Sequence, residues 1–394
     1  MSAEDTRKTN AAIAAAYDAV PYDTVADEKL DPGRVLGLGA VYGSATGFGD
    51  VLDMGCGTGA QLARAGATMR GWLVGVDISM EACRRARCQL APFGGRAKIF
   101  QTDVLDLDAG QLGRFDLVYC VGVIFVVPTE VRGHVLTLIA RCLRPGGVAV
   151  LGYYAGALDN ARARIHRTLR GLAEGESDRT VAVAKARSHL DYLLTGLPPG
   201  PRRGFLEVAI RETRNLPDVV FYHEVLNQAF EALRTSDIAH TLAGEGVDFA
   251  SYLAPVPFAA LEMPRERATA ADGLDASWGS YRHAVFVRGA EAPDLKRGNI
   301  VWTTSLVPAA AMDVTKPAPF RAPDRQIIAV RDPVTAAMLM ALREKPLPWT
   351  EAFVRGVAAA KANGLALAAS QESLCLSEFQ KLWAHEYVSP LASA

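Results

Sequence analysis

The sequence has little of what metal-binding, membrane-spanning or polyanion-binding proteins need. Its six cysteines form no Cys-x-x-Cys pair and have no nearby histidines at zinc-site spacing, so we expect reduced thiols and no metal. We find no charge-free apolar run of about 18 residues and no secretory signal pattern at the N-terminus, so we expect a cytoplasmic protein without a membrane partner. The 42 Lys and Arg nearly balance the 43 Asp and Glu, which argues against broad capture of nucleic acid.

What the chain does have is length and apolar content. Its 394 residues, 50% of them hydrophobic, suffice for two or three domains with substantial cores. Strand-like segments alternate with helix-forming segments up to about residue 155. This alternation predicts a doubly wound α/β sheet of the Rossmann-like kind.

A glycine-rich turn follows the first of these strands. The segment VLDMGCGTGAQLA, residues 51–63, passes from an apolar strand through Asp53 into the turn and then opens a helix. Such a turn lets the backbone approach a nucleotide cofactor at the carboxyl edge of a sheet. Its spacing fits NAD as well as S-adenosylmethionine (SAM). The turn residues expected at the cofactor are Gly55, Cys56, Gly57 and Gly59.

Carboxylates at three successive strand ends favour SAM over NAD. Asp53 would repel a pyrophosphate, but it can hold the ammonium that SAM carries. Asp77, after the strand at 72–76, can accept both hydroxyls of a ribose. Asp103, after the strand at 97–101, can accept from an adenine amino group, a need that NAD sites do not have. Further predicted cofactor contacts are Ile78, Val104 and the backbone from Cys120 to Gly122.

Two more strands, within 115–128 and 143–154, complete a pattern that resembles the class I SAM-dependent methyltransferases. The chain is also similar to the methyltransferases that carry a methyltransferase regulatory domain, a group that includes bacterial protein-lysine methyltransferases. This resemblance rests on YDAVPYDTV (17–25), FDLVYCVGVIFVVPTEVR (115–132), LPDVVFYHEVL (216–226) and YRHAVFVRG (281–289). It implies that the segment before the sheet folds over the cofactor, with Tyr17 and Tyr22 near the acceptor.

Two positions depart from that family's pattern. The family often has Tyr-Ser-Trp where this chain has Ile124-Phe125-Val126, and it has Asn where this chain has Tyr154. Both positions are expected on the acceptor side of the sheet. The acceptor is therefore less well defined by the resemblance than the cofactor is.

The pattern also predicts how the chain is divided. We expect an N-terminal helical cap (1–46), a SAM-binding core (47–155), a helical insertion between strands five and six (156–240), the last two of seven strands (241–290) and a separate α+β accessory domain (291–394). The accessory domain has no cofactor motif, so we expect it to serve as an interaction surface, such as that of a homodimer.

Methyl transfer from a sulfonium needs an aligned, deprotonated acceptor and little else from the protein. An amine acceptor would require aromatic walls and hydroxyls that hold the nitrogen. The candidate catalytic residues are Tyr17, Tyr22, Tyr153, Tyr154 and His223. We expect a lysine of a protein or peptide as the acceptor. The alternatives are O-methylation of a small carboxylic acid or hydroxyl compound, and a SAM-binding scaffold without turnover.

Overall fold

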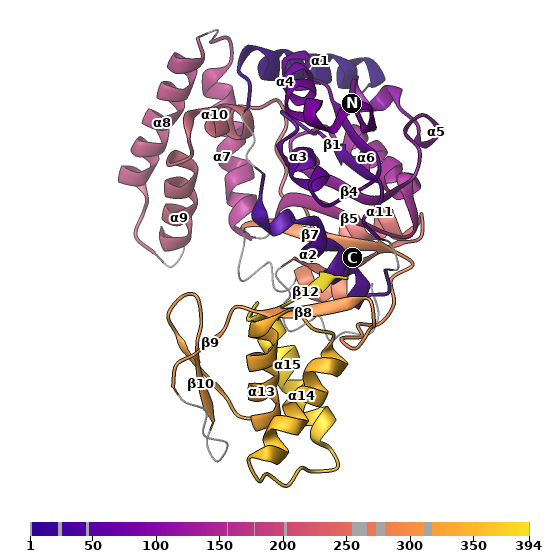
Figure 1. Cartoon of the computed structure of the whole chain (residues 1–394). Helices are drawn as coiled ribbons and strands as arrows, with labels where there is room; N and C mark the ends of the chain where they lie inside the picture. The colour runs from indigo at the N-terminus through magenta and orange to yellow at the C-terminus, as the bar shows by residue number, and fades with distance from the viewer. Residues whose placement is uncertain are drawn as a thin grey trace.

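A computed structural model describes residues 2–22, 26–44, 47–155, 157–176, 178–200, 203–253, 266–272, 280–310 and 317–393. Its centre is a sheet of seven strands (Figure 1), which are β1 (Val51–Met54), β2 (Leu73–Asp77), β3 (Ala97–Gln101), β4 (Phe115–Val121), β5 (Leu143–Ala155), β6 (Val247–Tyr252) and β7 (Ser280–Arg288). They lie in the order β3-β2-β1-β4-β5-β7-β6. Strands β1 to β5 are parallel, and β7 runs antiparallel between β5 and β6. The predicted seven-stranded Rossmann-like sheet is confirmed.

The sheet is buried on both faces, which explains why its central strands read as continuous apolar runs. Successive side chains of a strand point to opposite faces. In β4, Leu117 and Tyr119 therefore enter one hydrophobic core, while Val118 and Cys120 enter the other. The two cores are separated by the sheet itself.

Helices cover both faces of the sheet. On the first face lie α2 (Pro32–Val41), α3 (Ala60–Gly66) and α4 (Met80–Leu90), and on the second lie α6 (Thr129–Cys142) and α11 (Thr235–Ala243). Shorter helical segments are η1 (Glu28–Leu30), η2 (Ala91–Arg96), η3 (Val104–Asp106), α5 (Ala109–Leu112) and residues 266–272. No helix in the described ranges is long and apolar enough to cross a membrane.

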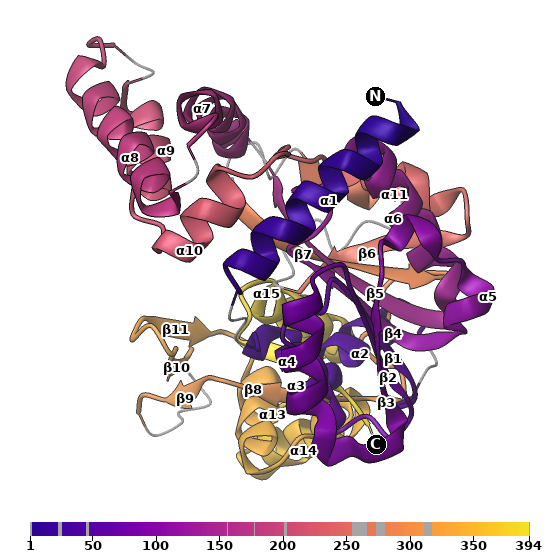
Figure 2. The same ribbon diagram turned by 90° about the horizontal axis from the view of Figure 1, so that it is seen from above.

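The expected N-terminal cap consists of two helices with different roles. Helix α1 (Ala3–Ala19) packs on α4 and runs from the side of α6 and α11 toward the insertion (Figure 2). Helix α2 is a core element, because every residue from Val35 to Val41 is buried. Asp31 caps it by accepting from the Gly33 amide at 2.9 Å, and Pro32 starts it.

The helical insertion forms a small bundle with its own core. It contains α7 (Ala157–Ala173), α8 (Arg179–Gly196), α9 (Arg203–Arg214), α10 (Asp218–Val220) and the π-helical turn η4 (Phe221–Val225). Leu169, Leu190 and Phe221 are fully buried at its centre. Figure 1 shows this bundle beside the sheet. Helix α11 does not belong to it, because Ile238 and Leu242 pack in the second core of the sheet.

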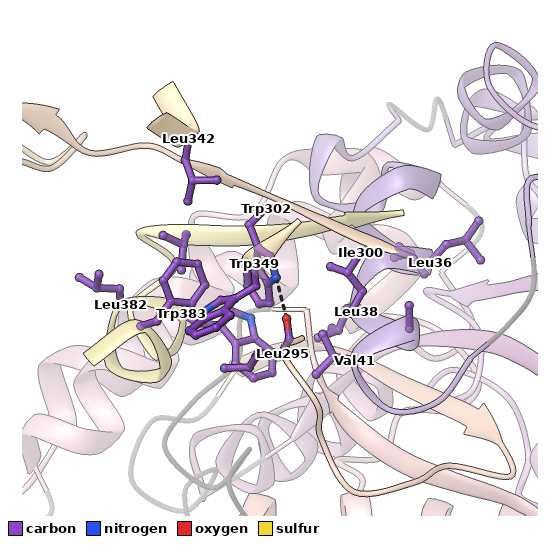
Figure 3. Packing of buried hydrophobic residues seen from close by; sticks show 14 of the residues in the cluster. Leu36, Leu38, Val41, Leu295, Ile300, Trp302, Leu342, Trp349, Leu382 and Trp383 are labelled. Carbon is purple, nitrogen blue, oxygen red and sulfur yellow. Dashed lines mark hydrogen bonds between the residues drawn. The ribbon is translucent and has the colours of Figure 1, made fainter. Parts of the chain in front are cut away.

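The C-terminal region differs from the separate domain that we expected. Its elements are β8 (Ile300–Thr304), β9 (Val307–Pro308), β10 (Ala318–Arg321), β11 (Ile327–Val330), α13 (Pro333–Glu344), α14 (Trp349–Ala362), α15 (Gln371–Ala384) and β12 (Val388–Ala392). Trp302 and Trp349 lie in one continuous core with Leu38 and Val41 of α2 (Figure 3). The Trp302 indole donates to the Leu295 carbonyl at 3.1 Å. The region is therefore packed onto the first face of the sheet through α2.

Strand β12 brings the C-terminal residues against α2. It pairs antiparallel with β8 from Val388 to Ala392, and its backbone crosses α2 at Gly37. A Cβ on Gly37 would lie 2.6 Å from the Leu391 Cα, which is closer than real Cβ atoms approach. Only glycine therefore permits this contact between helix and strand.

Candidate cofactor and acceptor site

A cavity of about 520 Å³ lies at the carboxyl edge of the sheet, where β1 to β4 end. Doubly wound sheets bind their ligands at this edge. The cavity is lined by Asn10, Ile13, Tyr17, Tyr22, Met54, Gly55, Gly57, Val76, Asp77, Ile78, Ala82, Thr102, Asp103, Val104, Val121, Gly122, Val123, Val126, Val127, Val131, Val135, Glu224 and Tyr281. These residues come from the sheet edge, from α1 and the segment after it, from α4 and α6, from the insertion and from β7.

The glycine turn after β1 forms part of the wall. Gly55 and Gly57 line the cavity with positive φ angles of 79° and 52°. A Cβ on Gly55 would lie 2.2 Å from a Val123 methyl group, so a side chain has no space there. Gly59 does not line the cavity. It caps the start of α3 at φ 82°, and a Cβ there would lie 3.1 Å from Ala86 of α4.

Asp77, at the end of β2, places a carboxylate at the cavity wall. Its two oxygens accept from the backbone amides of Gly57 and Ser79, each at 2.9 Å. Burial raises the pKa of Asp77 although these amide bonds act to lower it. Ile78 lines the cavity beside it. The two bonds fix the orientation of the carboxylate at the cavity wall.

Asp103, after β3, is held by two parts of the chain. It accepts from the Leu105 amide at 3.0 Å, and both of its oxygens accept from the Asn10 side-chain amide, at 3.1 and 2.9 Å. Val104 lines the cavity next to it. Asn10 belongs to α1, so this contact fastens α1 over the cavity.

A second contact fixes α1 to the start of α4. Asp18 accepts from the Ser79 hydroxyl at 2.6 Å and from the Glu81 amide at 3.0 Å. A carboxylate at a helix N-terminus is favourable because the amides there lack partners within the helix. Helix α1 is therefore anchored at both ends of the cavity.

Asp53 does not line the cavity. It lies in β1 directly before Met54, which does line it, and its exposed fraction is 5%. Burial, together with the nearby charge of Asp77, raises the pKa of Asp53 to about 7. Its carboxylate thus lies behind the cavity wall.

Two predicted contact residues contribute no side chain to the cavity. The Cys56 and Cys120 thiols are buried, and burial raises the pKa of each. After Cys120 the backbone turns into the cavity wall at Val121, Gly122 and Val123, with Gly122 at φ 84°. The expected contribution of this segment is therefore restricted to the residues after Cys120.

Glu224 and three tyrosines form another part of the cavity wall. Tyr17, Tyr22, Tyr281 and Glu224 all line it. Burial raises the pKa of Tyr22 to about 12, and the charge of Glu224 contributes to that shift. Burial also raises the pKa of Glu224, whose carboxylate accepts from the Tyr154 hydroxyl at 2.9 Å. Residues 23–25 of the YDAVPYDTV segment lie outside the described residues.

Three of the candidate catalytic residues lie outside the cavity wall. Tyr153 is fully buried in the second core, where its hydroxyl bonds to Thr235 at 2.8 Å, because it points to the opposite face of β5 from Tyr154. Tyr154 does not line the cavity, but it contacts two residues that do, since its hydroxyl donates to Glu224 and its ring packs against Tyr281. His223 is buried and packs against Tyr17. Tyr153 is therefore remote from the cavity, whereas Tyr154 and His223 contact residues that line it.

Sequence reasoning missed Asn10, Glu224 and Tyr281 as wall residues. Tyr281 could have been found from the antiparallel pairing of β5 with β7, since it lies opposite Tyr154 in the register. Glu224 adjoins His223, which the sequence proposes as catalytic, but no local pattern indicates which of the two side chains faces the cavity. Asn10 lies in an otherwise ordinary helical segment and carries no comparable signal.

The wall fits SAM by the chemistry of its groups. Asp77 offers acceptors for ribose hydroxyls, Asp103 offers one for an adenine amino group, and Gly55 and Gly57 allow close backbone approach. Val126, Val127, Val131 and Val135, which belong to α6 and the segment before it, supply apolar surface for a base. A site with these carboxylates is poorly suited to a pyrophosphate.

Comparisons with known proteins support this assignment. Residues 51–147 match the family described as "Methyltransferase domain". An uncharacterized protein of Rickettsia prowazekii (strain Madrid E) is 28% identical over 142 residues, which cover 35% of this chain and 56% of that protein. The ubiquinone biosynthesis O-methyltransferase of Thiobacillus denitrificans is 35% identical over 97 residues, covering 25% of this chain and 40% of that enzyme. The chain thus spans about half the length of these relatives.

The fold extends the comparison beyond that segment. The structure of PKMT2 from Rickettsia typhi is similar with a TM-score of 0.74 and 17% identity, covering 94% of this chain and 77% of that one. The same protein in complex with AdoHcy gives a TM-score of 0.73. The similarity includes the regions outside the methyltransferase domain, since it covers nearly the whole chain. From the matched segment, the sheet order and the cavity, we conclude that this chain carries a class I methyltransferase domain, with SAM as its cofactor.

Proposed function

We propose that this protein transfers the methyl group of SAM to an amine nitrogen, with a lysine side chain of a protein or peptide as the acceptor. The observation that carries the proposal is the Glu224 carboxylate, which shares one cavity with the cofactor residues and lies among Tyr17, Tyr22 and Tyr281. The charge of Glu224 raises the pKa of each of these three tyrosines. The Glu224 carboxylate therefore acts on the hydroxyls of all three tyrosines.

This arrangement suits a cationic acceptor. A carboxylate in a partly buried site attracts an ammonium more strongly than it would in water, and tyrosine rings add a cation–π attraction. Burial also raises the pKa of Glu224, so its carboxylate can take up the proton that an ammonium must lose. A neutral hydroxyl acceptor would gain little from this charge.

The chain's own residues contribute binding, alignment and exclusion of water. SAM, when bound, supplies a methyl group on a sulfonium, and an amine lone pair displaces the sulfur. Asp77 and Asp103 would hold the ribose and adenine, while the Glu224 carboxylate would fix the acceptor nitrogen. The hydroxyls of Tyr17 and Tyr22 can orient the nitrogen once it is neutral. Alignment of this kind can supply roughly 7–11 kcal/mol of the barrier reduction.

The lysine assignment has further support from PKMT2, a protein lysine methyltransferase whose fold is similar along 94% of this chain. The insertion and the C-terminal region would then offer docking surface for the protein that carries the lysine. The lysine assignment therefore relies on the fold similarity along the whole chain, because the relatives found by sequence match only part of it.

O-methylation is the second candidate. It is favoured by the 35% identity to a ubiquinone biosynthesis O-methyltransferase. That match covers only 25% of this chain. In an O-methyltransferase, Glu224 could serve as the base that deprotonates a hydroxyl acceptor. A third alternative is a SAM-binding scaffold without turnover.

The test uses purified protein, methyl-labelled SAM and a desalted extract of the source cell, with the label separated by molecular size and stability to base. Base-stable label in protein supports lysine methylation. Label in a small or base-labile product supports O-methylation, and bound SAM without any labelled product supports the scaffold.

A pair of variants then tests the role of Glu224. Loss of a charged hydrogen-bond partner in Glu224→Gln should raise the acceptor KM by about 10- to 150-fold, while the Kd of SAM stays within about 2-fold. The matched control is Glu245→Gln, which removes a half-buried partner of Arg141 that does not line the cavity and should leave both constants unchanged. An unchanged acceptor KM in Glu224→Gln would contradict the proposed amine site.

A further inference from the structure

The π-helical turn η4 directs two successive side chains to different places. Glu224 lines the cavity, whereas His223 contacts the end of α1. A π-helical turn inserts an extra residue into the helical repeat, and such turns occur frequently at functional sites. Here the turn joins the proposed acceptor anchor to the helix that covers the cofactor residues.

His223 holds the chain between two cavity tyrosines. Its Nε2 donates to the Val20 carbonyl at 2.6 Å. Its ring stacks on Tyr17 with centroids 4.1 Å apart and planes 9° apart, and it meets Tyr22 edge-on at 5.9 Å. Because Tyr17 and Tyr22 lie on either side of Val20 in the sequence, one side chain fixes both rings.

The contacts of His223 favour a structural role over the catalytic role proposed from the sequence. A carbonyl oxygen only accepts, so Nε2 must carry the proton of the neutral ring. Burial lowers the pKa of His223 to about 4, which makes the ring a weak base at neutral pH. His223 also has no place in the cavity wall.

Tyr17 lines the cavity together with Asp77 and Glu224. Burial raises the pKa of the Tyr17 hydroxyl, and the charges of both Glu224 and Asp77 raise it further. For Tyr22 the contributing charge is that of Glu224. A displacement of Tyr17 would therefore change the surroundings of both Asp77 and Glu224.

We propose that His223 is a positioning residue that couples cofactor binding to acceptor binding, by clamping Tyr17, Val20 and Tyr22 against the turn that carries Glu224. The acceptor half of this inference rests on the proposed function. The cofactor half does not, since it concerns only how α1 is held over the SAM residues. His223 itself does not line the cavity.

Two variants separate the contacts of His223. His223→Phe keeps a ring to stack on Tyr17 but loses the donor to Val20, and His223→Gln keeps a donor but loses the ring. Since each removes a contact of ordinary strength, each should raise both the Kd of SAM and the acceptor KM by about 2- to 12-fold. The Kd of SAM is measured by calorimetry without an acceptor.

The matched control is His166, in the same insertion. It is similarly buried, at 4% exposed against 2% for His223, and its Nε2 bonds to the Asn227 carbonyl at 3.0 Å. His166→Phe and His166→Gln should lower the melting temperature but leave the Kd of SAM and the acceptor KM unchanged. If the His166 variants change the Kd of SAM and the acceptor KM as much as the His223 variants do, His223 has only a structural role and the proposal is overturned.

Hydrogen exchange of the unaltered protein provides a test that needs no variant. Saturating SAM should slow exchange in residues 17–22 and 221–225 together, because the clamp joins them. Protection of residues 17–22 alone would refute the coupling. If the coupling holds but amines are not methylated, the proposed function fails while the cofactor half of this inference stands.

Discussion

Replacing Asp53 by Asn should change how the stability of the ligand-free protein depends on pH. Burial, followed by the charge of Asp77, raises the pKa of Asp53 from 3.8 to about 7. The folded state therefore binds this proton more tightly than the unfolded state does. Its contribution to stability is greatest below about pH 4 and is lost as the pH rises through 7.

The size of the effect follows from the two pKa values. Between pH 5 and pH 8, ionisation of Asp53 should lower the free energy of unfolding of the wild type by about 3 kcal/mol, and Asn at this position cannot titrate. Urea denaturation of both proteins at the two pH values gives the difference directly. Other titrating groups largely cancel because both proteins contain them.

The same measurement has a clear negative outcome. If the stability difference between wild type and Asp53→Asn is equal at pH 5 and pH 8, Asp53 does not titrate in this range and the argument from its burial fails.

Three other substitutions test the site and the core. Asp77→Ala removes the acceptor of two backbone amides and of the expected ribose, so SAM should bind at least about 100-fold more weakly by calorimetry; unaltered binding would count strongly against our cofactor assignment. Gly55→Ala forces a Cβ to within 2.2 Å of Val123 at a positive φ, and should lower the free energy of unfolding by about 1–3 kcal/mol in urea. Trp302→Ala should lower the free energy of unfolding by about 3–5 kcal/mol and lower the temperature of a single unfolding transition in calorimetry. Two separate transitions would show that the C-terminal region unfolds independently.

The cofactor edge of the fold could be predicted because its signals are local. Asp77 ends the strand β2 and Asp103 lies two residues after the strand β3, and parallel strands place such residues at one edge of the sheet. The bounds of β3, Ala97–Gln101, agree with the strand predicted from the sequence. A strand, its end and the turn after it occupy fewer than ten residues, so no long-range information is needed.

The acceptor side could not be predicted in the same way. It is assembled from an N-terminal segment, the insertion and β7, and only tertiary packing brings Tyr17, Glu224 and Tyr281 together. The sequence proposed both Tyr153 and Tyr154 as catalytic, although side chains alternate along β5, because the face of each depends on how the strand packs against the rest of the fold. The shared core of α2 and the C-terminal region escaped prediction for the same reason, since Leu38 and Trp302 lie far apart in the sequence.

The contact between α2 and β12 has a consequence for synthesis of the protein. About 350 residues separate the end of α2 from the start of β12, and at roughly 5–20 residues per second a ribosome needs roughly 20 to 70 s to make them. During that time the apolar surface of α2 around Gly37 lacks the strand that covers it. Newly made chains should therefore depend on chaperones over this interval, and ribosome-bound fragments that end before Val388 should aggregate more readily than the full chain.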